Sequence, residues 1–355
     1  MPVVTNGKLI YTAHPEREYE HGVHSKYVEE ELNTDTIELN GGILVRLIAI
    51  SSDPYMRYRM RDKSIPMFAP ALTIGEPMDN FAVGQVVRSE DPNFTVGDYA
   101  AGFFEFANYS VYPGKSSHAF KFCFKVPKVP GLPLSSYTGT FGLAGKTAYT
   151  GWHLWGKEKA KTSKTLFVSG AGGALGLFLL EYVRIVSPHL KIIATAGTAE
   201  KLELCKKAGA DVVFNYKEVD LEKALAEHGP IDIYWDNTAG PILDAALANI
   251  NFFGLIIACG AVSEINHDPS AYVKYFGKIF QHCVTVHGFI FRFGPDAVRA
   301  SEEFNKEVPP LVAAGKITIL EDRFQGLKEA GRALESVHSG KNLGKAVVIV
   351  GEEEV

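Results

Sequence analysis

The sequence of 355 residues predicts an α/β protein, in which a doubly wound parallel sheet is joined to a second, β-rich domain. Its length exceeds that of one ordinary domain, so two domains are expected. The first third contains short β-branched runs separated by Gly and Pro, a pattern typical of a compact barrel-like β domain. Further along the chain, buried strands alternate with helical segments, which indicates parallel βα units.

Composition narrows the class of protein. Hydrophobic residues make up 46% of the chain and charged residues 22%, the balance of a soluble protein with a sizeable core. The net charge of −5 argues against nucleic acids or acidic membranes as partners. The apolar runs fall short of the roughly 20 residues that a spanning helix needs, and the N-terminus lacks the features of a secretory signal. Four cysteines without a CxxC pair favour a reducing compartment, so a cytoplasmic protein is expected.

The β-rich part begins with two clear strands. Residues 42–50 and 81–88 are rich in β-branched residues, with turn residues nearby. Residues 127–133 hold three prolines, which make a stiff connector, so a domain edge is expected shortly after them. Near the C-terminus, strands are expected at 316–320 and 345–350, and periodicity leaves open whether they extend the parallel sheet or return to the first domain.

The parallel sheet is predicted from five buried strands with helical patterns between them. The strands span residues 165–169, 191–196, 211–216, 231–236 and 254–259. Repeated strand–helix units of this length place the strands parallel and the helices on both faces of the sheet.

A glycine-rich turn follows the first of these strands and opens a helix. Gly170, Gly173 and Gly176 follow one another at intervals of three, and Gly172 is a fourth glycine in the turn. Glycines let a backbone turn sharply and approach a pyrophosphate, and the helix N-terminus then offers N–H groups to the phosphates. A turn that merely packs is the alternative, but a dinucleotide site is favoured within five βα units.

The end of the next strand indicates which dinucleotide binds. An NAD site usually has Asp or Glu about 20 residues beyond the glycines, bonded to the ribose 2′-OH. Here residues 196–198 read Ala-Gly-Thr, and Lys201 follows. The missing carboxylate removes repulsion of a 2′-phosphate and the lysine adds attraction, so NADPH/NADP is favoured. The alternative is that Lys201 is a surface lysine paired with Glu203.

The sequence lacks an obvious zinc site, so no metal is predicted. Residues 50–57 contain no cysteine, and the Gly75–Glu76 turn has no histidine before it. His21 and His24 have ligand spacing but lie in a polar stretch that reads as a solvated loop. Hydride addition to an activated C=C bond needs less help than alcohol oxidation, for which this architecture would use a Lewis acid. The addition needs a hydrogen-bond donor for the developing enolate oxygen and a proton for the α-carbon.

Several blocks in the right order carry a family resemblance along nearly the whole chain. They span residues 53–57, 142–149, 170–176, 197–201, 214–217, 234–240, 259–263, 288–290 and 340–345. Together they resemble the zinc-independent branch of the medium-chain dehydrogenase/reductase superfamily. Within that branch the chain is similar to the leukotriene B4 12-hydroxydehydrogenase / prostaglandin reductase / alkenal double-bond reductase group.

The resemblance implies a fold, an activity and an assembly. It implies a Rossmann-type NADP-binding domain over 139–311 and a GroES-like catalytic domain built from 1–138 and 312–355. The implied activity is NADPH-dependent reduction of the C=C bond of α,β-unsaturated aldehydes and ketones, and the usual assembly is a homodimer.

The resemblance also implies the residues that contact the cofactor. The pyrophosphate would lie on Gly173, Ala174, Leu175 and Gly176, and the 2′-phosphate side on Lys201 and Tyr216. Asn237 would lie beside the cofactor, and Asn342 would reach its nicotinamide half. The walls around the nicotinamide and ribose would be Cys259, Gly260, Ala261, Val262, Ser263, Ile265, Phe289, Ile290 and Phe291.

Two departures from the family pattern bear on the chemistry. The family commonly has a tyrosine where this chain has Ile265, and that tyrosine is assigned to stabilising the enolate or relaying the proton. Isoleucine cannot donate a hydrogen bond. Tyr55 is our first candidate for the catalytic role, ahead of Tyr272 and Tyr275, although Tyr55 as an aromatic wall is equally favoured. Lys146 replaces an apolar residue and faces either a phosphate or substrate oxygen, or the surface.

Two rival functions stay open at this point. The same scaffold could serve as an NADPH quinone reductase. The chain could also be an NADPH-binding protein without catalysis, a reading that only the missing tyrosine supports.

Overall fold

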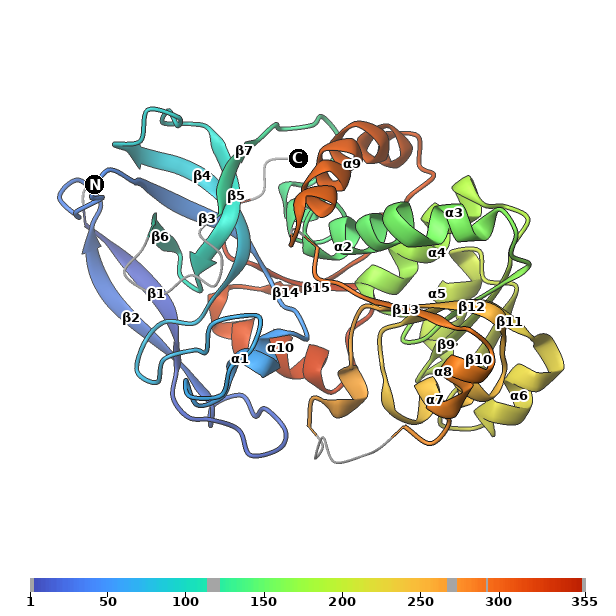
Figure 1. The fold of residues 1–355 in the computed structure, drawn as a ribbon. Helices are drawn as coiled ribbons and strands as arrows, with labels where there is room; N and C mark the ends of the chain where they lie inside the picture. Colours follow the sequence, from blue (N-terminus) through green and yellow to red (C-terminus); the bar gives the residue numbers. More distant parts are fainter. Residues whose placement is uncertain (1–2, 114–121, 267–272, 292, 353–355) are drawn as a thin grey trace. The chain divides into compact units, whose positions relative to one another are not determined.

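The computed structural model describes residues 3–113, 122–266, 273–291 and 293–352. The chain divides into two compact units, one made of Met1–Gly142 with Glu321–Val355 and the other of Leu143–Leu320. The boundaries thus follow Gly142 and Leu320, whereas sequence analysis placed them after residues 138 and 311. Figure 1 labels the helices and strands of both units.

The first unit contains a seven-stranded sheet with the order β14-β15-β3-β4-β5-β7, in which β6 also pairs with β3. Its strands are β3 (Ile43–Ser51), β4 (Asp79–Ser89), β5 (Tyr99–Glu105), β6 (Tyr109–Tyr112), β7 (Cys123–Val126), β14 (Glu321–Gln325) and β15 (Lys345–Ile349). A separate antiparallel pair is formed by β1 (Val3–Tyr11) and β2 (Ser25–Asn33). Short helical segments complete the unit: α1 (Met56–Arg59), η1 (Leu134–Thr138), η4 (Leu327–Glu329) and α10 (Ala330–His338).

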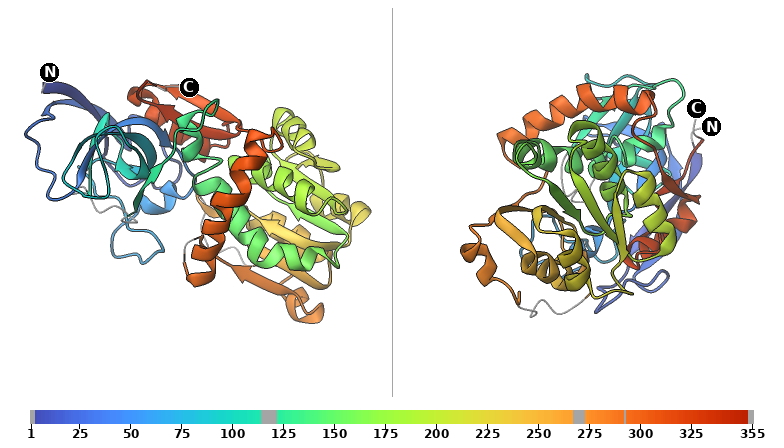
Figure 2. Two further views of the ribbon diagram at one scale, coloured as in Figure 1. Left: turned by 90° about the horizontal axis from the view of Figure 1, so that it is seen from above. Right: turned by 90° about the vertical axis from the view of Figure 1, so that its right-hand side faces the viewer.

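The C-terminal segment belongs to the sheet of the first unit. β15 pairs antiparallel with β3, and β14 pairs parallel with β15. In Figure 2 the red C-terminal strands accordingly lie against strands from the first third of the chain. The strand predicted at 316–320 is wrong, because β14 begins only at Glu321. The backbone N–H of Thr318 instead donates to the Glu181 carboxylate at 2.9 Å.

The second unit contains a six-stranded parallel sheet with the order β10-β9-β8-β11-β12-β13. The strands are β8 (Thr165–Val168), β9 (Lys191–Ala196), β10 (Val212–Asn215), β11 (Ile231–Asp236), β12 (Ile250–Ala258) and β13 (Thr285–Gly288). The helical segments are α2 (Leu143–Gly151), the π-helical η2 (Trp152–Gly156), α3 (Lys157–Ala160), α4 (Ala174–Val186), α5 (Ala199–Lys207), α6 (Leu221–His228), α7 (Gly240–Ala248), the short η3 (Val262–Glu264), α8 (Gly277–Gln281) and α9 (Pro295–Ala313).

The arrangement of the second unit confirms the predicted Rossmann-type fold. Helices α2 and α4 lie on one face of the sheet, and α6 and α7 on the other (Figure 1). The strand order reverses between β8 and β11. In open sheets of this kind, ligands bind outside the carboxyl ends of the strands at that reversal. Among the described residues, no helix combines the length and the apolar character needed to cross a lipid bilayer.

Candidate active site

The glycine turn joins β8 to α4 at the reversal of strand order. Gly170 adopts a positive φ of 56°, which favours glycine. The N–H of Ala171 donates to the Thr195 carbonyl at 2.8 Å, so the turn is fixed to β9. A Cβ on Gly176 would lie 2.5 Å from the backbone of Ala171. Only glycine lets the helix pack this closely on its own turn, as the dinucleotide motif requires.

The start of α4 has the geometry of an anion cradle. Gly173 is the N-cap residue, and the first turn of the helix carries no acidic side chain. A Cβ on Gly173 would meet only the Gly170 carbonyl oxygen, at 3.7 Å, among the described atoms. The first backbone N–H groups of a helix carry partial positive charge and lack partners within the helix. The residues Gly173 to Gly176 therefore fit a pyrophosphate group.

Two of the sequence-predicted residues, Lys201 in α5 and Tyr216 just after β10, lie near glycines that follow the strands β8 and β9. The Lys201 side chain packs over the glycine turn, since a Cβ on Gly172 would lie 2.7 Å from the Lys201 Cβ. Tyr216 is 41% exposed, and its hydroxyl lies 3.1 Å from the position of a Cβ on Gly197. Both residues thus border the glycines at which the adenosine half of a dinucleotide would lie.

Lys217 adds a second positive charge to this region, which sequence analysis did not assign. Its Nζ lies 5.8 Å from the centre of the Tyr216 ring. A cation next to an aromatic ring suits a site for an adenine nucleotide that carries an additional phosphate. The available signal was its place directly after Tyr216 in a block that already carried the family resemblance.

Asp236 joins the carboxyl ends of β8 and β11, and sequence analysis missed it. Its Oδ1 accepts hydrogen bonds from the Tyr234 hydroxyl at 2.7 Å and from the Ala239 N–H at 2.8 Å. Burial raises the pKa of Asp236, while these donors act in the opposite direction. An acidic residue at the last position of a buried strand was the signal in the sequence.

Asn237 is held rigidly beside this carboxylate. Its Nδ2 donates to the Ser169 carbonyl at 2.7 Å, and its Oδ1 accepts from Trp235 Nε1 at 3.0 Å. Its backbone N–H donates to Ser169 Oγ at 3.0 Å. The amide orientation is therefore fixed at the strand reversal, where sequence analysis predicted a cofactor contact.

The segment after β12 folds back onto the end of β11. The N–H groups of Cys259 and Gly260 donate to the Asp236 carbonyl at 2.8 and 3.0 Å, and Val262 N–H donates to the Asn237 carbonyl at 3.2 Å. Burial raises the pKa of Cys259 to about 12, so its thiol stays neutral. Ile265 is 9% exposed and ends this wall without a donor group on its side chain.

The aromatic residues after β13 border a small cavity. Phe289 lies 5.0 Å from Trp155 between ring centres, and 6.0 Å from Trp235. A cavity of about 230 Å³ is lined by Phe289 and Ile290 together with Trp155 and Phe293. Phe291, the last of the three predicted wall residues, directly follows Ile290 and is half-buried.

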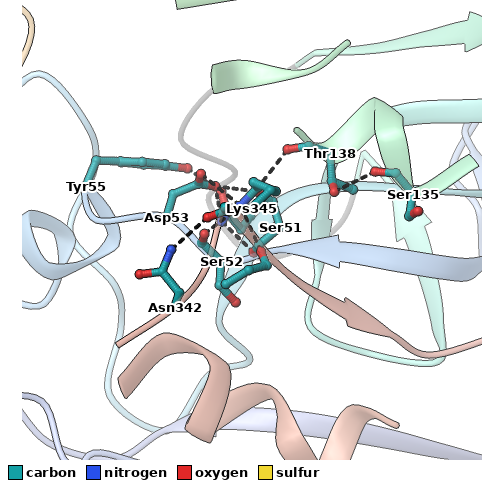
Figure 3. A network of polar contacts seen from close by, with 11 residues as sticks. Ser51, Ser52, Asp53, Tyr55, Ser135, Thr138, Asn342 and Lys345 are labelled. Carbon is teal, nitrogen blue, oxygen red and sulfur yellow. Dashed lines mark hydrogen bonds and ion pairs between the residues drawn. The ribbon is translucent and has the colours of Figure 1, made fainter. Parts of the chain in front are cut away.

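The first unit holds a buried polar network, shown in Figure 3. Asp53 is its centre: Lys345 Nζ lies 3.2 Å from Oδ1, and Asn80 Nδ2 donates to Oδ2 at 3.0 Å. The Ser51 hydroxyl also donates to Oδ2. Asp53, Asn80 and Lys345 are all buried.

Tyr55 is attached to this network through its hydroxyl group. The hydroxyl donates to Asn80 Oδ1 at 2.5 Å, and Figure 3 shows it directed toward Asp53 and Lys345. Burial raises the pKa of Tyr55 well above the ordinary value, with Arg59 acting in the opposite direction. Asn342 lies in the same close-up, and its Nδ2 donates to the Gly344 carbonyl at 2.8 Å.

The other residues singled out in the sequence lie elsewhere. The Tyr275 hydroxyl donates to Glu222 on α6 at 3.0 Å, and Tyr272 lies outside the described residues. Lys146 is buried, with its Nζ 5.7 Å from the centre of the Phe304 ring, so it is not a surface lysine. In the described part of the chain, no three His, Cys, Asp or Glu side chains are grouped in a way that could hold a metal ion.

Two family models match the chain. An N-terminal domain of oxidoreductases matches residues 22–120, and a domain described as zinc-binding dehydrogenase matches residues 174–308. The second match lies within the unit that carries the glycine turn.

Curated relatives match over most of the chain. A 2-alkenal reductase (NADP(+)-dependent) of Nicotiana tabacum is 34% identical over 340 residues, which cover 92% of this chain and 94% of the relative. The (+)-pulegone reductase of Mentha piperita is 33% identical, with 88% and 89% covered. The NADPH-dependent curcumin reductase of Escherichia coli is 30% identical, with 88% and 89% covered.

Solved structures give the same picture of the fold. The CurA protein of Vibrio vulnificus in complex with NADPH superposes with a TM-score of 0.83 at 27% identity, covering 98% of this chain and 99% of that one. An Escherichia coli quinone oxidoreductase complexed with NADPH has a TM-score of 0.69 at 20% identity, covering 97% and 99%, which shows likeness in fold alone.

Proposed function

The chain belongs to the zinc-independent alkenal reductase family of medium-chain dehydrogenases/reductases, and we propose how its residues serve the NADPH-dependent reduction of the C=C bond of α,β-unsaturated aldehydes and ketones. The observation that carries this proposal is the glycine cradle from Gly170 to Gly176, followed by Lys201 where an NAD site would have an acid. Two relatives, the 2-alkenal reductase and the (+)-pulegone reductase, support the same reaction.

The cofactor is NADPH, and the residues of the second unit fit it. Gly173 to Gly176 hold the pyrophosphate with backbone N–H groups, where a larger residue at 176 would close the cradle. Lys201 and Tyr216, joined by Lys217, bind the 2′-phosphate side. Bound there, the cofactor supplies the hydride that adds to the β-carbon of the substrate.

The remaining predicted contacts would form the nicotinamide half of the site. Asn237 offers a fixed amide at the end of β11, and Cys259 to Ile265 with Phe289 to Phe291 are the proposed walls of this half. We propose that Asn342, in the C-terminal segment, also contacts the nicotinamide half of the cofactor. Its amide is oriented by the Gly344 carbonyl, which supports a fixed rather than a mobile role.

An apolar segment next to Tyr55 suits the tail of an alkenal. Ile65, Met67 and Phe68 are 51%, 44% and 38% exposed, which is unusual for three large apolar side chains within four residues. The Phe68 ring lies 6.4 Å from the rings of both Tyr55 and Tyr58. A substrate with a polar carbonyl end and an apolar chain matches this combination.

We propose that Tyr55 contacts the substrate, either through a catalytic hydroxyl or as an aromatic wall, since Ile265 has no hydroxyl group. Tyr55 is half-buried and lies between the polar network and the apolar segment, so it is suited to contact the substrate near its carbonyl end. Hydride addition leaves negative charge on the substrate oxygen as an enolate, and a proton then reaches the α-carbon.

We also propose that two copies of the chain associate through β13. This strand is the last in the sheet order, and Val286 on it is 45% exposed. Phe276, just before α8, and Phe280, within it, are 67% and 76% exposed, so the same region carries large apolar side chains. An open sheet edge flanked by such residues is a typical place for a two-fold contact between copies.

A cytoplasmic location is the simplest proposal for the compartment. All four cysteines are free thiols in the structure. Free thiols persist in reducing compartments, of which the cytosol is the main example.

The direct experiment compares oxidants of NADPH. The proposal expects saturable NADPH oxidation with 2-nonenal at a higher kcat/KM than with a benzoquinone. The opposite order would favour a quinone reductase. Tight NADPH binding without turnover of any enone would favour a binding protein.

A further inference from the structure

The Asn80 side chain has a single possible orientation in the polar network. Its Nδ2 donates to the Ser51 carbonyl at 2.8 Å and to Asp53 Oδ2 at 3.0 Å, which uses both amide hydrogens. A reversed amide would place Oδ1 against a carbonyl oxygen and a carboxylate. Asn80 Oδ1 therefore faces the Tyr55 hydroxyl, which must be the donor in the 2.5 Å contact.

The buried ion pair between Lys345 and Asp53 holds the Asn80 amide in this orientation. Lys345 Nζ contacts three oxygens: the Ser52 carbonyl at 2.6 Å, the Ala346 carbonyl at 2.9 Å and Asp53 Oδ1 at 3.2 Å. Three acceptors use all three ammonium hydrogens. Because the lysine cannot turn without losing a partner in a buried place, Asp53 is held, and Asp53 in turn holds Asn80.

The phenolic proton of Tyr55 is consequently committed to the interior. A tyrosine has one hydroxyl hydrogen, and here it lies between the Tyr55 oxygen and Asn80 Oδ1. Burial also raises the pKa of Tyr55, so the phenol is a weaker acid than an exposed tyrosine. The Tyr55 ring lies 6.4 Å from the ring of Phe68, which is 38% exposed, so the ring is the part of Tyr55 that adjoins the apolar segment.

We infer that Asn80 is a positioning residue that turns the Tyr55 proton away from the substrate, so that Tyr55 serves the reaction by placing the substrate with its ring and not by donating a proton. The inference rests on the proposed function. Hydride transfer to the β-carbon moves the electron pair of the C=C bond toward the carbonyl oxygen, giving an enolate. Water then supplies the proton that forms the new C–H bond at the α-carbon, and the hydroxide left behind is neutralised by the medium.

The test compares Tyr55→Phe and Asn80→Leu, singly and together, with 2-nonenal at saturating NADPH. Both changes remove the hydrogen bond between Tyr55 and Asn80, and Asn80→Leu also removes the two bonds that Asn80 donates to Ser51 and Asp53. Each is expected to raise KM about three- to tenfold with kcat within about threefold of the parent. The double variant is expected to show no further change, because the two residues act as one unit. The pH profile of kcat is expected to stay the same in Tyr55→Phe. Asn93→Leu, at an exposed asparagine of the same unit, is the control and should change neither constant.

Three outcomes would overturn the inference. A loss in kcat of a hundredfold in Tyr55→Phe, with an altered pH profile, would make Tyr55 the proton donor. Additive effects of the two substitutions would show that Asn80 does not act through Tyr55. If Asn80→Leu does not fold, Asn80→Ser takes its place in the comparison, and Tyr55→Phe still decides whether Tyr55 donates the proton. A parent protein that turns over no enone would instead overturn the proposed function, and this inference with it.

Discussion

The Lys345 ammonium lies 3.2 Å from the Asp53 carboxylate, and both side chains are largely withdrawn from water, at 5% and 12% exposed. The two residues are far apart in sequence, on β15 and directly after β3. Burial lowers the pKa of Lys345, and the Asp53 charge opposes that shift. This pair fastens the C-terminal strand to the segment that carries Tyr55.

Lys345→Met is expected to destabilise the first unit strongly. The substitution leaves the Asp53 carboxylate buried without its cation, which typically costs about 3–5 kcal/mol. Urea denaturation followed by far-UV circular dichroism measures the change in the free energy of unfolding. Lys341→Met, at an exposed lysine in the preceding loop, is the control and should stay within about 0.5 kcal/mol of the parent. A loss below about 1 kcal/mol for Lys345→Met would show that the pair is not structural.

Lys201→Ala is expected to weaken NADPH without affecting NADH. Loss of a hydrogen bond to a charged group costs about 1.5–3 kcal/mol, so KM for NADPH should rise about ten- to a hundredfold. Lys207→Ala, an exposed lysine on the same helix, is the matched control. Steady-state kinetics with each cofactor decide the matter. Equal losses for NADPH and NADH would show that Lys201 does not read the 2′-phosphate.

His338 is expected to make the stability of the protein fall in mild acid. Burial lowers its pKa to about 4, and the Arg57 charge acts in the same direction. The folded state thus favours neutral imidazole. Above the unfolded pKa of about 6.5, this preference costs the folded state nothing. As the pH falls from there toward 4, the unfolded state binds a proton that the folded state does not, and the free energy of unfolding falls by about 3 kcal/mol in all.

The measurement is the free energy of unfolding at several pH values between 7 and 4. His338→Leu should flatten the profile over that range, because it removes the group that the unfolded state protonates. An unchanged slope in this variant would assign the acid sensitivity to other groups.

Val286→Lys is expected to convert a dimer into a monomer. A lysine on the β13 edge places charge where two sheet edges would meet. Light scattering after size-exclusion chromatography gives the mass of the parent and the variant, with Val298→Lys, at an exposed site on α9, as the control. A parent protein that elutes as a monomer at all concentrations would contradict the proposed assembly.

The parts of the fold that depend on local patterns could be predicted from sequence. Four of the five predicted strands of the parallel sheet are largely buried and apolar, and the glycine turn has three of its glycines at fixed intervals, so short segments carried the information. Lys201 could be found in the same way, because an NAD site has its acid at a fixed distance along the chain from the glycines, and this chain has no acid there.

The parts that depend on distant contacts could not be predicted. β13 was missed because its residues are mostly exposed and show no buried run. The strand expected at 316–320 was misplaced because apolar residues there precede β14. The contacts of Tyr55 with Asn80, and of Asp53 with Lys345, join segments that only the folded sheet brings together.

The central claim is that the hydride of NADPH reaches the β-carbon of a conjugated carbonyl compound. Turnover of 2-nonenal with NADPH deuterated at C4 of the nicotinamide, on the face that transfers hydride, tests it directly by NMR of the product. The account predicts nonanal with deuterium at C3. Deuterium at C1 of 2-nonen-1-ol would contradict it, because the carbonyl group and not the double bond would then have been reduced.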